Sequence, residues 1–148
     1  MPKLPHSVLV VLHTVELEVL LLERALRPGY WQSVTGSVDR LDEPLEAAAA
    51  REVAEETGID AAQGRLARWN VANTFEIYVQ WRHRFAPGAV YNTEHVFGLA
   101  LPARLPVRLA EEEHVAFTWL PWREAAEKCF SWSNRDAIRL LGERAVIS

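Results

Sequence analysis

Residues 36–59 read GSVDRLDEPLEAAAAREVAEETGI, and they carry the strongest structural signal in the chain. Glu52, Glu55 and Glu56 are three and four positions apart, so on a helix their side chains share one face. At this spacing Glu52 and Glu56 repel each other by ~0.2–0.5 kcal/mol, which disfavours the helix. Clustered carboxylate oxygens suit hard divalent cations, which proteins hold through a few carboxylates, water and substrate phosphates. The stretch therefore predicts a cation site on a helix.

The ends of this helix are marked by the residues that flank it. Pro44 follows two acidic residues and suits the first helical position, where its missing N–H would have no helical partner. The acidic side chains before it complement the positive end of the helix dipole. Gly58 suits the position just after the helix. We expect a helix that opens near residues 42–44, ends before Gly58 and packs on a sheet through Leu45, Ala48, Ala49 and Val53.

Apolar runs on both sides of the helix predict β-strands. Residues 7–13 and 19–22 are rich in Val and Leu, which is typical of strands buried on both faces, and their short connection predicts a hairpin. Residues 31–35 form a third β-prone segment that stops at Gly36. The rest predicts strands at residues 65–70, 75–84, 94–101 and 115–120, a weak helix from residue 121 and a better one at residues 133–144, capped by Ser133. This order predicts an α/β fold with a mixed β-sheet flanked by helices.

Length and composition favour one domain over residues 1–148. The 148 residues are 49% hydrophobic and contain neither a Pro/Gly/Ser-rich linker nor a repeat. The single Cys129 excludes an internal disulfide, and the apolar part of the N-terminus is too short for a membrane span or a signal peptide, so we expect a cytoplasmic protein. A net charge of −4 disfavours binding to a nucleic acid polymer. The oligomeric state is not readable from the sequence.

From the residues alone, two interpretations of the glutamate helix stay open. It is either a cation site or an acidic face in contact with solvent, which is a common arrangement. A polyanionic ligand would favour the first interpretation, because cations and a few arginines or lysines would have to offset its repulsion by the glutamates.

Residues 51–59, REVAEETGI, match the signature R-E-U-x-E-E-x-G-U of the Nudix family, where U is a bulky aliphatic residue. Glu43 also stands eight positions before Arg51, as the signature requires, whereas six residues instead of five separate Gly36 from Glu43. The chain thus resembles Nudix hydrolases. The resemblance implies a Nudix-type α/β/α sandwich and hydrolysis of a diphosphate linked to another moiety. It also implies Mg²⁺ as cofactor, with Mn²⁺ as an alternative.

The family also implies roles for the acidic residues. Glu52 and Glu56 are the expected principal metal ligands, and Glu55 is a further ligand or a support for the bound water. Arg51 is expected to orient these carboxylates, with Glu43 behind it. Glu113 precedes a histidine and the predicted strand at residues 115–120, so it becomes the candidate carboxylate from outside the helix, although an EEEH run alone is typical of a solvated loop. The resemblance therefore implies the catalytic set Glu55, Glu56 and Glu113 and the metal-binding set Glu52, Glu55, Glu56 and Glu113.

Four separated segments resemble one subgroup of the family, the dihydroneopterin triphosphate diphosphatases. They are WQSVTGS at residues 31–37, FEIY and RHRFAPG at residues 75–78 and 82–88, NTE at residues 92–94, and SWSNR at residues 131–135. The implied reaction is attack of water on a small-molecule triphosphate, dihydroneopterin triphosphate, with release of pyrophosphate and dihydroneopterin monophosphate. The implied substrate-binding residues are Arg24, Thr35, Phe75, Glu76, Ile77, Tyr78, His114 and Ser131.

Several alternatives remain open at this level. Phe75 to Tyr78 suit a wall of the pterin pocket or a core strand equally, and His114 suits a substrate contact or an ordinary strand edge. Arg24 has the plain alternative of an exposed arginine at a strand end. Two other functions compete, a nucleotide-pool pyrophosphohydrolase on the same scaffold and a non-catalytic Nudix module that binds a nucleotide.

Overall fold

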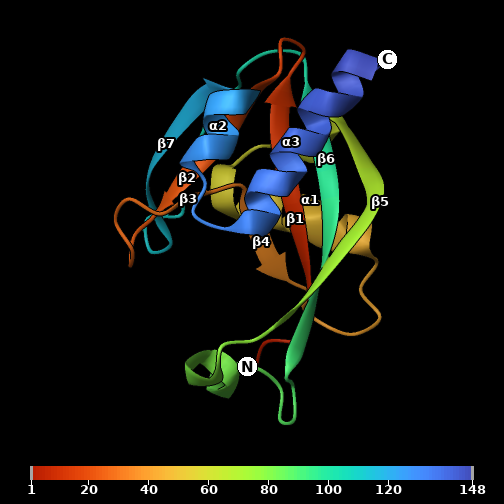
Figure 1. Ribbon diagram of the computed structural model, residues 1–148, viewed down its shortest axis with the longest axis vertical. Coiled ribbons are helices and arrows are strands. Elements are labelled where there is room, and N and C mark those ends of the chain that lie inside the picture. Colours follow the sequence, from red (N-terminus) through yellow and green to blue (C-terminus); the bar gives the residue numbers. More distant parts are fainter. Residues whose placement is uncertain (1, 148) are drawn as a thin grey trace.

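The computed structural model describes residues 2–147, with side chains through residue 144, as a seven-stranded sheet between helices (Figure 1). The longer helices are α1 (Leu45–Thr57), α2 (Trp122–Lys128) and α3 (Trp132–Ile147), and two short 3₁₀ helices are η1 (Ala61–Gln63) and η2 (Val79–Arg84). The strands are β1 (His6–Thr14), β2 (Glu18–Arg24), β3 (Trp31–Gln32), β4 (Val34–Ser37), β5 (Arg65–Glu76), β6 (Tyr91–Leu101) and β7 (His114–Pro121).

The sheet is mixed and forks at β1. The main path runs β3-β2-β1-β6-β5, in which β1 and β6 are parallel and the other neighbours are antiparallel. β4 pairs with the Ser7–Val10 part of β1, whereas β2 meets β1 only at His13 and Val19. β2 then pairs with β3 and β7. The predicted mixed sheet is confirmed. β2 and β4 diverge, because they pair with different parts of β1.

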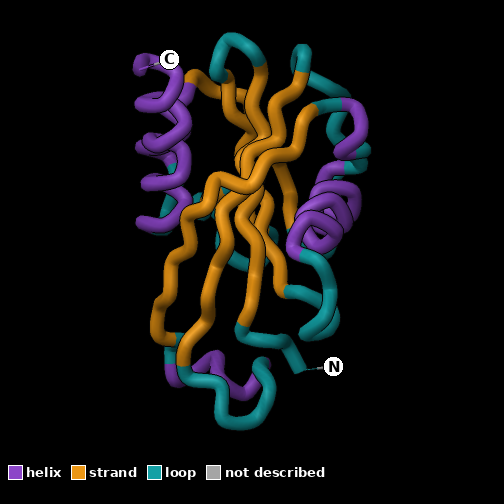
Figure 2. Tube along the Cα trace, turned by 90° about the vertical axis from the view of Figure 1, so that its right-hand side faces the viewer, coloured by secondary structure: helices purple, strands orange, loops and turns teal. Residues whose placement is uncertain are grey.

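Each face of the sheet buries its own core. Val8, Val10 and Leu12 of β1 face the α1 side, whereas the alternate residues Leu9 and Val11 face α2 and α3. Figure 2 shows the strands edge-on, with α1 on one side and α3 on the other. The predicted burial of this strand on both faces, and the helices on both faces, are confirmed. No helix in the described residues is long and apolar enough to cross a membrane.

Helix α1 lies close to the sheet because small residues face it. Ala48, Ala49 and Val53 are 0% exposed. Pro44 occupies the N-cap position, so the helix begins at Leu45, one residue later than predicted. Gly58 has a φ of 72°, which favours glycine, and its N–H donates to the Ala54 carbonyl. The predicted C-terminal end is confirmed.

The predicted strand over residues 75–84 is wrong beyond Glu76. Glu76 pairs with Tyr91 at the first residue of β6, and the Ile77 N–H donates to the Val90 carbonyl. Beyond this point the chain reverses at Gly88, so no strand is available as a partner and the segment coils into η2. The predicted strand at residues 94–101 begins earlier than expected, at Tyr91.

Two other boundaries differ for local reasons. The segment at residues 31–35 is two strands, because β3 pairs with β2 and β4 pairs with β1 on either side of the fork. Helix α3 begins at Trp132, and its cap is Ser131, whose Oγ accepts from the Asn134 N–H at 3.3 Å. Ser133, the predicted cap, lies within the first turn.

Asn134 joins α3 to the fork, and its loss should destabilise the fold. Its Oδ1 accepts a buried bond of 2.8 Å from the Ser33 N–H. Asn134→Ala leaves that N–H without a partner, so we expect the free energy of unfolding to fall by about 1–3 kcal/mol in urea denaturation. An unchanged free energy of unfolding in Asn134→Ala would show that this bond does not hold the helix to the sheet.

Candidate active site

The three glutamates of α1 differ in burial. Glu56 is 1% exposed, and the Glu52 side chain is 12% exposed. The Glu55 side chain is 58% exposed, and its Oε2 lies 3.5 Å from Arg51 Nη1. The helix therefore turns Glu52 and Glu56 toward the sheet and leaves Glu55 at its edge.

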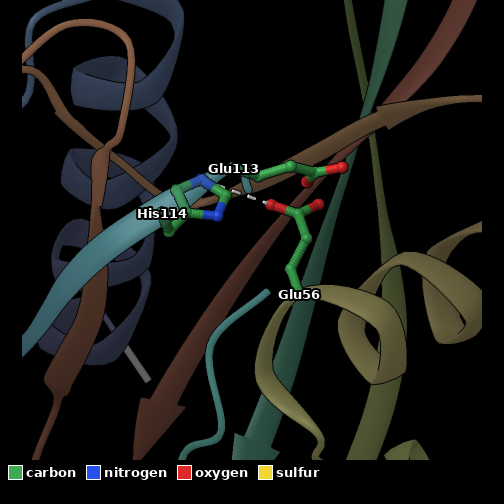
Figure 3. A group of neighbouring side chains, drawn as sticks. All are labelled: Glu56, Glu113 and His114. Carbon is green, nitrogen blue, oxygen red and sulfur yellow. Dashed lines mark ion pairs between the residues drawn. The ribbon is translucent and has the colours of Figure 1, made fainter. Parts of the chain in front are cut away.

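Glu113, at the end of the turn before β7, and His114, the first residue of β7, meet Glu56. His114 Nε2 lies 3.6 Å from Glu56 Oε1, and one ligand atom of each of the three residues lies within 4.8 Å of the others. Figure 3 shows the Glu56 side chain extending from α1 toward Glu113 and His114. The Ala25 N–H donates to the Glu113 carbonyl at 2.9 Å, which ties this strand start to the end of β2. Sheet pairing thus brings together carboxylates that are far apart in sequence.

Burial dominates the electrostatics of this cluster. It raises the pKa of the Glu56 carboxyl to about 10, with further contributions from Glu52 and Glu113, and it also raises the pKa of Glu52. Burial, followed by the nearby Arg24, lowers the pKa of His114 to about 4. At neutral pH without a cation, the Glu56 carboxyl therefore keeps its proton and the His114 imidazole is uncharged. A bound divalent cation would supply the positive charge that allows the carboxyl groups to ionise.

Arg51 holds α1 to the loop that precedes it. Its guanidinium donates to both Glu43 oxygens at 3.1 Å, to Glu52 Oε1 at 2.8 Å and to the Ser37 carbonyl at 3.1 Å. These bonds raise the pKa of Arg51, and the bond from Arg51 is the main cause that lowers the pKa of Glu43. Glu43 also accepts from the Asp39 N–H at 2.8 Å. The predicted orienting position of Arg51 therefore corresponds to direct contacts with Glu52 and the loop.

The additional residue between Gly36 and Glu43 lies in an exposed turn. The Glu43 N–H donates to the Arg40 carbonyl, Arg40 pairs with Asp42 at 2.9 Å, and Leu41 is 75% exposed. Gly36 stays directly against the Glu52 carboxyl group, where an added Cβ would collide with it. The loop therefore contacts the helix on both sides of this turn.

A cavity of about 440 Å³ lies over the carboxylates. It is lined by six of the predicted site residues, namely Arg24, Thr35, Glu52, Glu56, Glu113 and His114. Gln32 and Lys3 also line it and were not predicted. Gln32 is buried and its Nε2 donates to Thr35 Oγ1 at 3.4 Å; its place within the WQSVTGS segment was the available signal. Lys3 had no such signal, because it reaches the cavity through bonds of its backbone to Arg84 and Ala86.

Five predicted substrate-binding residues lie outside the lining of this cavity. Phe75 and Glu76 end β5, Ile77 and Tyr78 lead into η2, and Ser131 caps α3. Ile77 is buried, Tyr78 is exposed and contacts the Trp81 ring edge-on, and Glu76 pairs with Arg82 at 2.6 Å. Their roles in substrate binding stay predictions.

The model of the NUDIX domain family matches residues 3–141. The chain belongs to the Nudix family. A dihydroneopterin triphosphate diphosphatase of Escherichia coli K12 is 45% identical over 139 residues, which cover 92% of this chain and 91% of that protein. A dihydroneopterin triphosphate diphosphatase of Haemophilus influenzae is 35% identical over 137 residues, covering 90% and 84%. The structure of the E. coli dihydroneopterin triphosphate pyrophosphohydrolase superposes with a TM-score of 0.84 at 44% identity, covering 95% and 96%.

These comparisons confirm the resemblance drawn from the signature, and the chain is a Nudix hydrolase. Nudix hydrolases use divalent metal ions, and the arrangement of Glu56, Glu113 and His114 matches that requirement in its choice of residue types.

The contact between Gly36 and Glu52 should be essential to this Nudix site. Gly36→Ala places a methyl group where the Glu52 carboxyl lies, so the side chain must move away from Glu56. We expect kcat/KM to fall roughly a hundredfold, as for other small displacements of catalytic groups. The moving group is the end of a flexible side chain, so the urea unfolding midpoint should stay close to that of the wild type. Unchanged kcat/KM would show that Glu52 does not need this position.

The raised pKa of Glu56 predicts how stability depends on pH when metal is removed. The folded protein keeps a proton that an unfolded carboxyl, with a pKa of about 4.3, has lost. The free energy of unfolding in EDTA should therefore fall as the pH rises from about 4.3 towards about 10, by at most ~1.4 kcal/mol per pH unit for this one proton. The lowered pKa of His114 has the opposite effect, because it makes the free energy of unfolding rise with pH between about 4 and 6.5.

The control is Glu56→Gln, which resembles the protonated acid and should reduce this decline. Saturating Mg²⁺ should also reduce it, because the cation stabilises the ionised form. The measurement is urea denaturation at each pH, and equal slopes for wild type and variant would contradict the assignment.

Proposed function

We propose that this Nudix hydrolase is a Mg²⁺-dependent pyrophosphohydrolase that converts dihydroneopterin triphosphate to dihydroneopterin monophosphate and pyrophosphate. The observation that carries the proposal is the 45% identity, over 92% of the chain, to a protein of that name. The cavity supports it, because carboxylates for a cation and the cationic Arg24 line the same space.

The donor atoms around Glu56 fit a hard divalent cation. Glu56 Oε2 is buried and has no hydrogen-bonding partner among the described residues, and Glu52 and Glu113 line the same cavity. We infer that Glu52, Glu56 and Glu113 hold the ion, with Glu55 next to them as a further ligand or as support for its water. A mainly carboxylate set favours Mg²⁺, and Mn²⁺ suits the same oxygens. A bound ion of this kind supplies positive charge next to phosphoryl oxygens and acidifies water.

The residues of the chain then position the substrate for attack by water. Arg24, half-buried at the end of β2, lines the same cavity as the carboxylates and offers charge-assisted hydrogen bonds to the phosphates. Thr35 and His114 provide polar contacts without charge, since the lowered pKa of His114 keeps its ring neutral. The water oxygen forms a bond to phosphorus as the anhydride P–O bond breaks, and pyrophosphate leaves with the electron pair.

The proton from the water needs a carboxylate nearby. Glu55, Glu56 and Glu113 are the candidates for the general base. We favour Glu113, because it lines the cavity, is exposed and has no side-chain hydrogen bond among the described residues, so one of its oxygens can hold the ion while the other accepts the proton. Glu56 is the deepest of the three, so its role is to hold the cation.

The test is a panel of substrates with pyrophosphate release as the readout. With Mg²⁺ we expect dihydroneopterin triphosphate to give the highest kcat/KM among it, dATP and an oxidised guanine nucleotide. Glu56→Gln should lower kcat by roughly 10²–10³-fold, since it removes the central charge of the cation cluster. Glu46→Gln is the matched control, because Glu46 is an exposed glutamate of the same helix that pairs with Arg68.

Equal or faster turnover of the nucleotides would instead favour a nucleotide-pool hydrolase. Binding without turnover of any compound would favour the non-catalytic module. Full activity of Glu56→Gln would remove the metal assignment.

A further inference from the structure

Two buried side chains on β6 present oxygen atoms without partners. Asn92 is 5% exposed and Glu94 is 6% exposed. Asn92 Oδ1 and Glu94 Oε1 have no hydrogen-bonding partner among the described residues. Residues two apart on a strand point to the same face, and Val96, two residues further, packs in the core beneath α2 and α3. Both oxygens therefore lie on the face opposite the carboxylate cluster of α1.

The remaining polar atoms of both side chains are fixed by neighbours. Asn92 Nδ2 donates to Ser7 Oγ at 2.9 Å, which leaves Oδ1 as an acceptor only. Burial raises the pKa of Glu94, whereas a hydrogen bond from Ser133 in the first turn of α3 lowers it. Buried polar atoms in native proteins usually have partners, so two acceptors without a donor, on residues two apart on one strand, point to a ligand that donates hydrogen bonds.

Neither acceptor lines the cavity over the carboxylates, but strand pairing connects them to a residue at its edge. Ser37 of β4 lines the cavity and is paired with Ser7 of β1, and Ser7 is aligned with Glu94 of β6. Neighbouring strands lie about 4.8 Å apart, so Glu94 is roughly 10 Å from Ser37 along this polar row. That is a suitable span for a substrate with a triphosphate at one end and a ring at the other.

Predicted substrate-binding residues outside the cavity flank the same pair. Phe75 is directly opposite Asn92 across the β5–β6 pairing. Ser131 caps α3 two residues before Ser133, which bonds Glu94. Two predicted substrate-binding residues that do not line the cavity over the carboxylates thus lie near this pair of buried acceptors.

We propose that Glu94 and Asn92 recognise the pyrimidine edge of the substrate's pterin ring, by accepting hydrogen bonds from the ring N3–H and the 2-amino group. This inference rests on the proposed function and names the residues that determine its ring specificity. The 2-amino-4-oxo edge presents two adjacent donors, which match two acceptors. Adenine does not present that pair, so it would leave a buried acceptor unpaired, and sites built on such bonds reject analogues that lack them.

The test measures ring binding without hydrolysis. The probes are neopterin and its 2,4-dioxo analogue, in which oxygen replaces the 2-amino group, titrated by ligand fluorescence into the full chain in EDTA. Wild type should bind neopterin more tightly than the analogue and should reject N3-methyl neopterin. Glu94→Gln should weaken neopterin binding roughly ten- to a hundredfold and favour the 2,4-dioxo analogue, because the new amide donates where the carboxylate accepted.

Glu127→Gln is the matched control, since Glu127 is an exposed glutamate on α2, and it should leave both affinities unchanged. A purely structural role for Glu94 would lower the melting temperature of Glu94→Gln but leave the ratio of the two affinities unchanged, which would overturn the proposal. Equal binding of the three ligands to wild type would also overturn it and needs no variant. Because the assay omits metal and turnover, its result is independent of the outcome of the pyrophosphate panel.

Discussion

The burial of the Glu56 carboxyl group beside two other carboxylates is the constraint on which the rest of the site depends. An uncompensated buried charge is costly, so this arrangement persists only with a proton or a cation in it. The surrounding features serve to hold it in place. Arg51 fixes Glu52 and the preceding loop, Gly36 leaves room for the Glu52 carboxyl, and pairing of β7 with β2 delivers Glu113. The fold therefore keeps negative charge concentrated where a polyphosphate must be bound through a cation.

The fork in the sheet determines how this centre relates to the rest of the molecule. Because β4 and β2 take different parts of one edge of β1, β3 and β4 diverge and leave Gln32 and Thr35 at the cavity. The polar row from Ser37 to Glu94 crosses the sheet from the same place. Asn134 bonds the Ser33 N–H between the two short strands, so the position of α3 depends on the same fork. The two faces of the sheet are thus connected through a few residues of β4.

The parts of the structure that were predictable depend on short-range patterns. The core-facing alanines of α1, the glycine at its end and the two-sided burial of β1 follow from spacing along the chain, and all are present. The predicted end of the strand at residue 84 was wrong because the length of a strand depends on its partner. Glu76 pairs with Tyr91, the first residue of β6, so no partner residue remains for the chain after Glu76. SWSN contains two serines, and the observed cap is the one three residues before Asn134. The residues of the site divide in the same way, into those placed by spacing along the chain and those placed by contacts with distant segments. The glutamates of α1 share a face by helical spacing, whereas Lys3 reaches the cavity only through backbone bonds to the distant residues Arg84 and Ala86.

The anchoring of the loop before α1 has a consequence for recognising distant relatives. The Ser37 carbonyl and Glu43 are both bonded to Arg51 of the helix, and Val38 is buried in the core, whereas residues 40–42 project into solvent. Insertions at residues 40–42 therefore cost little, since the restrained residues lie on either side of them. A search pattern with rigid spacing would overlook chains of this kind. One that treats the glycine and the helical segment as separate blocks joined by a variable gap would retain them.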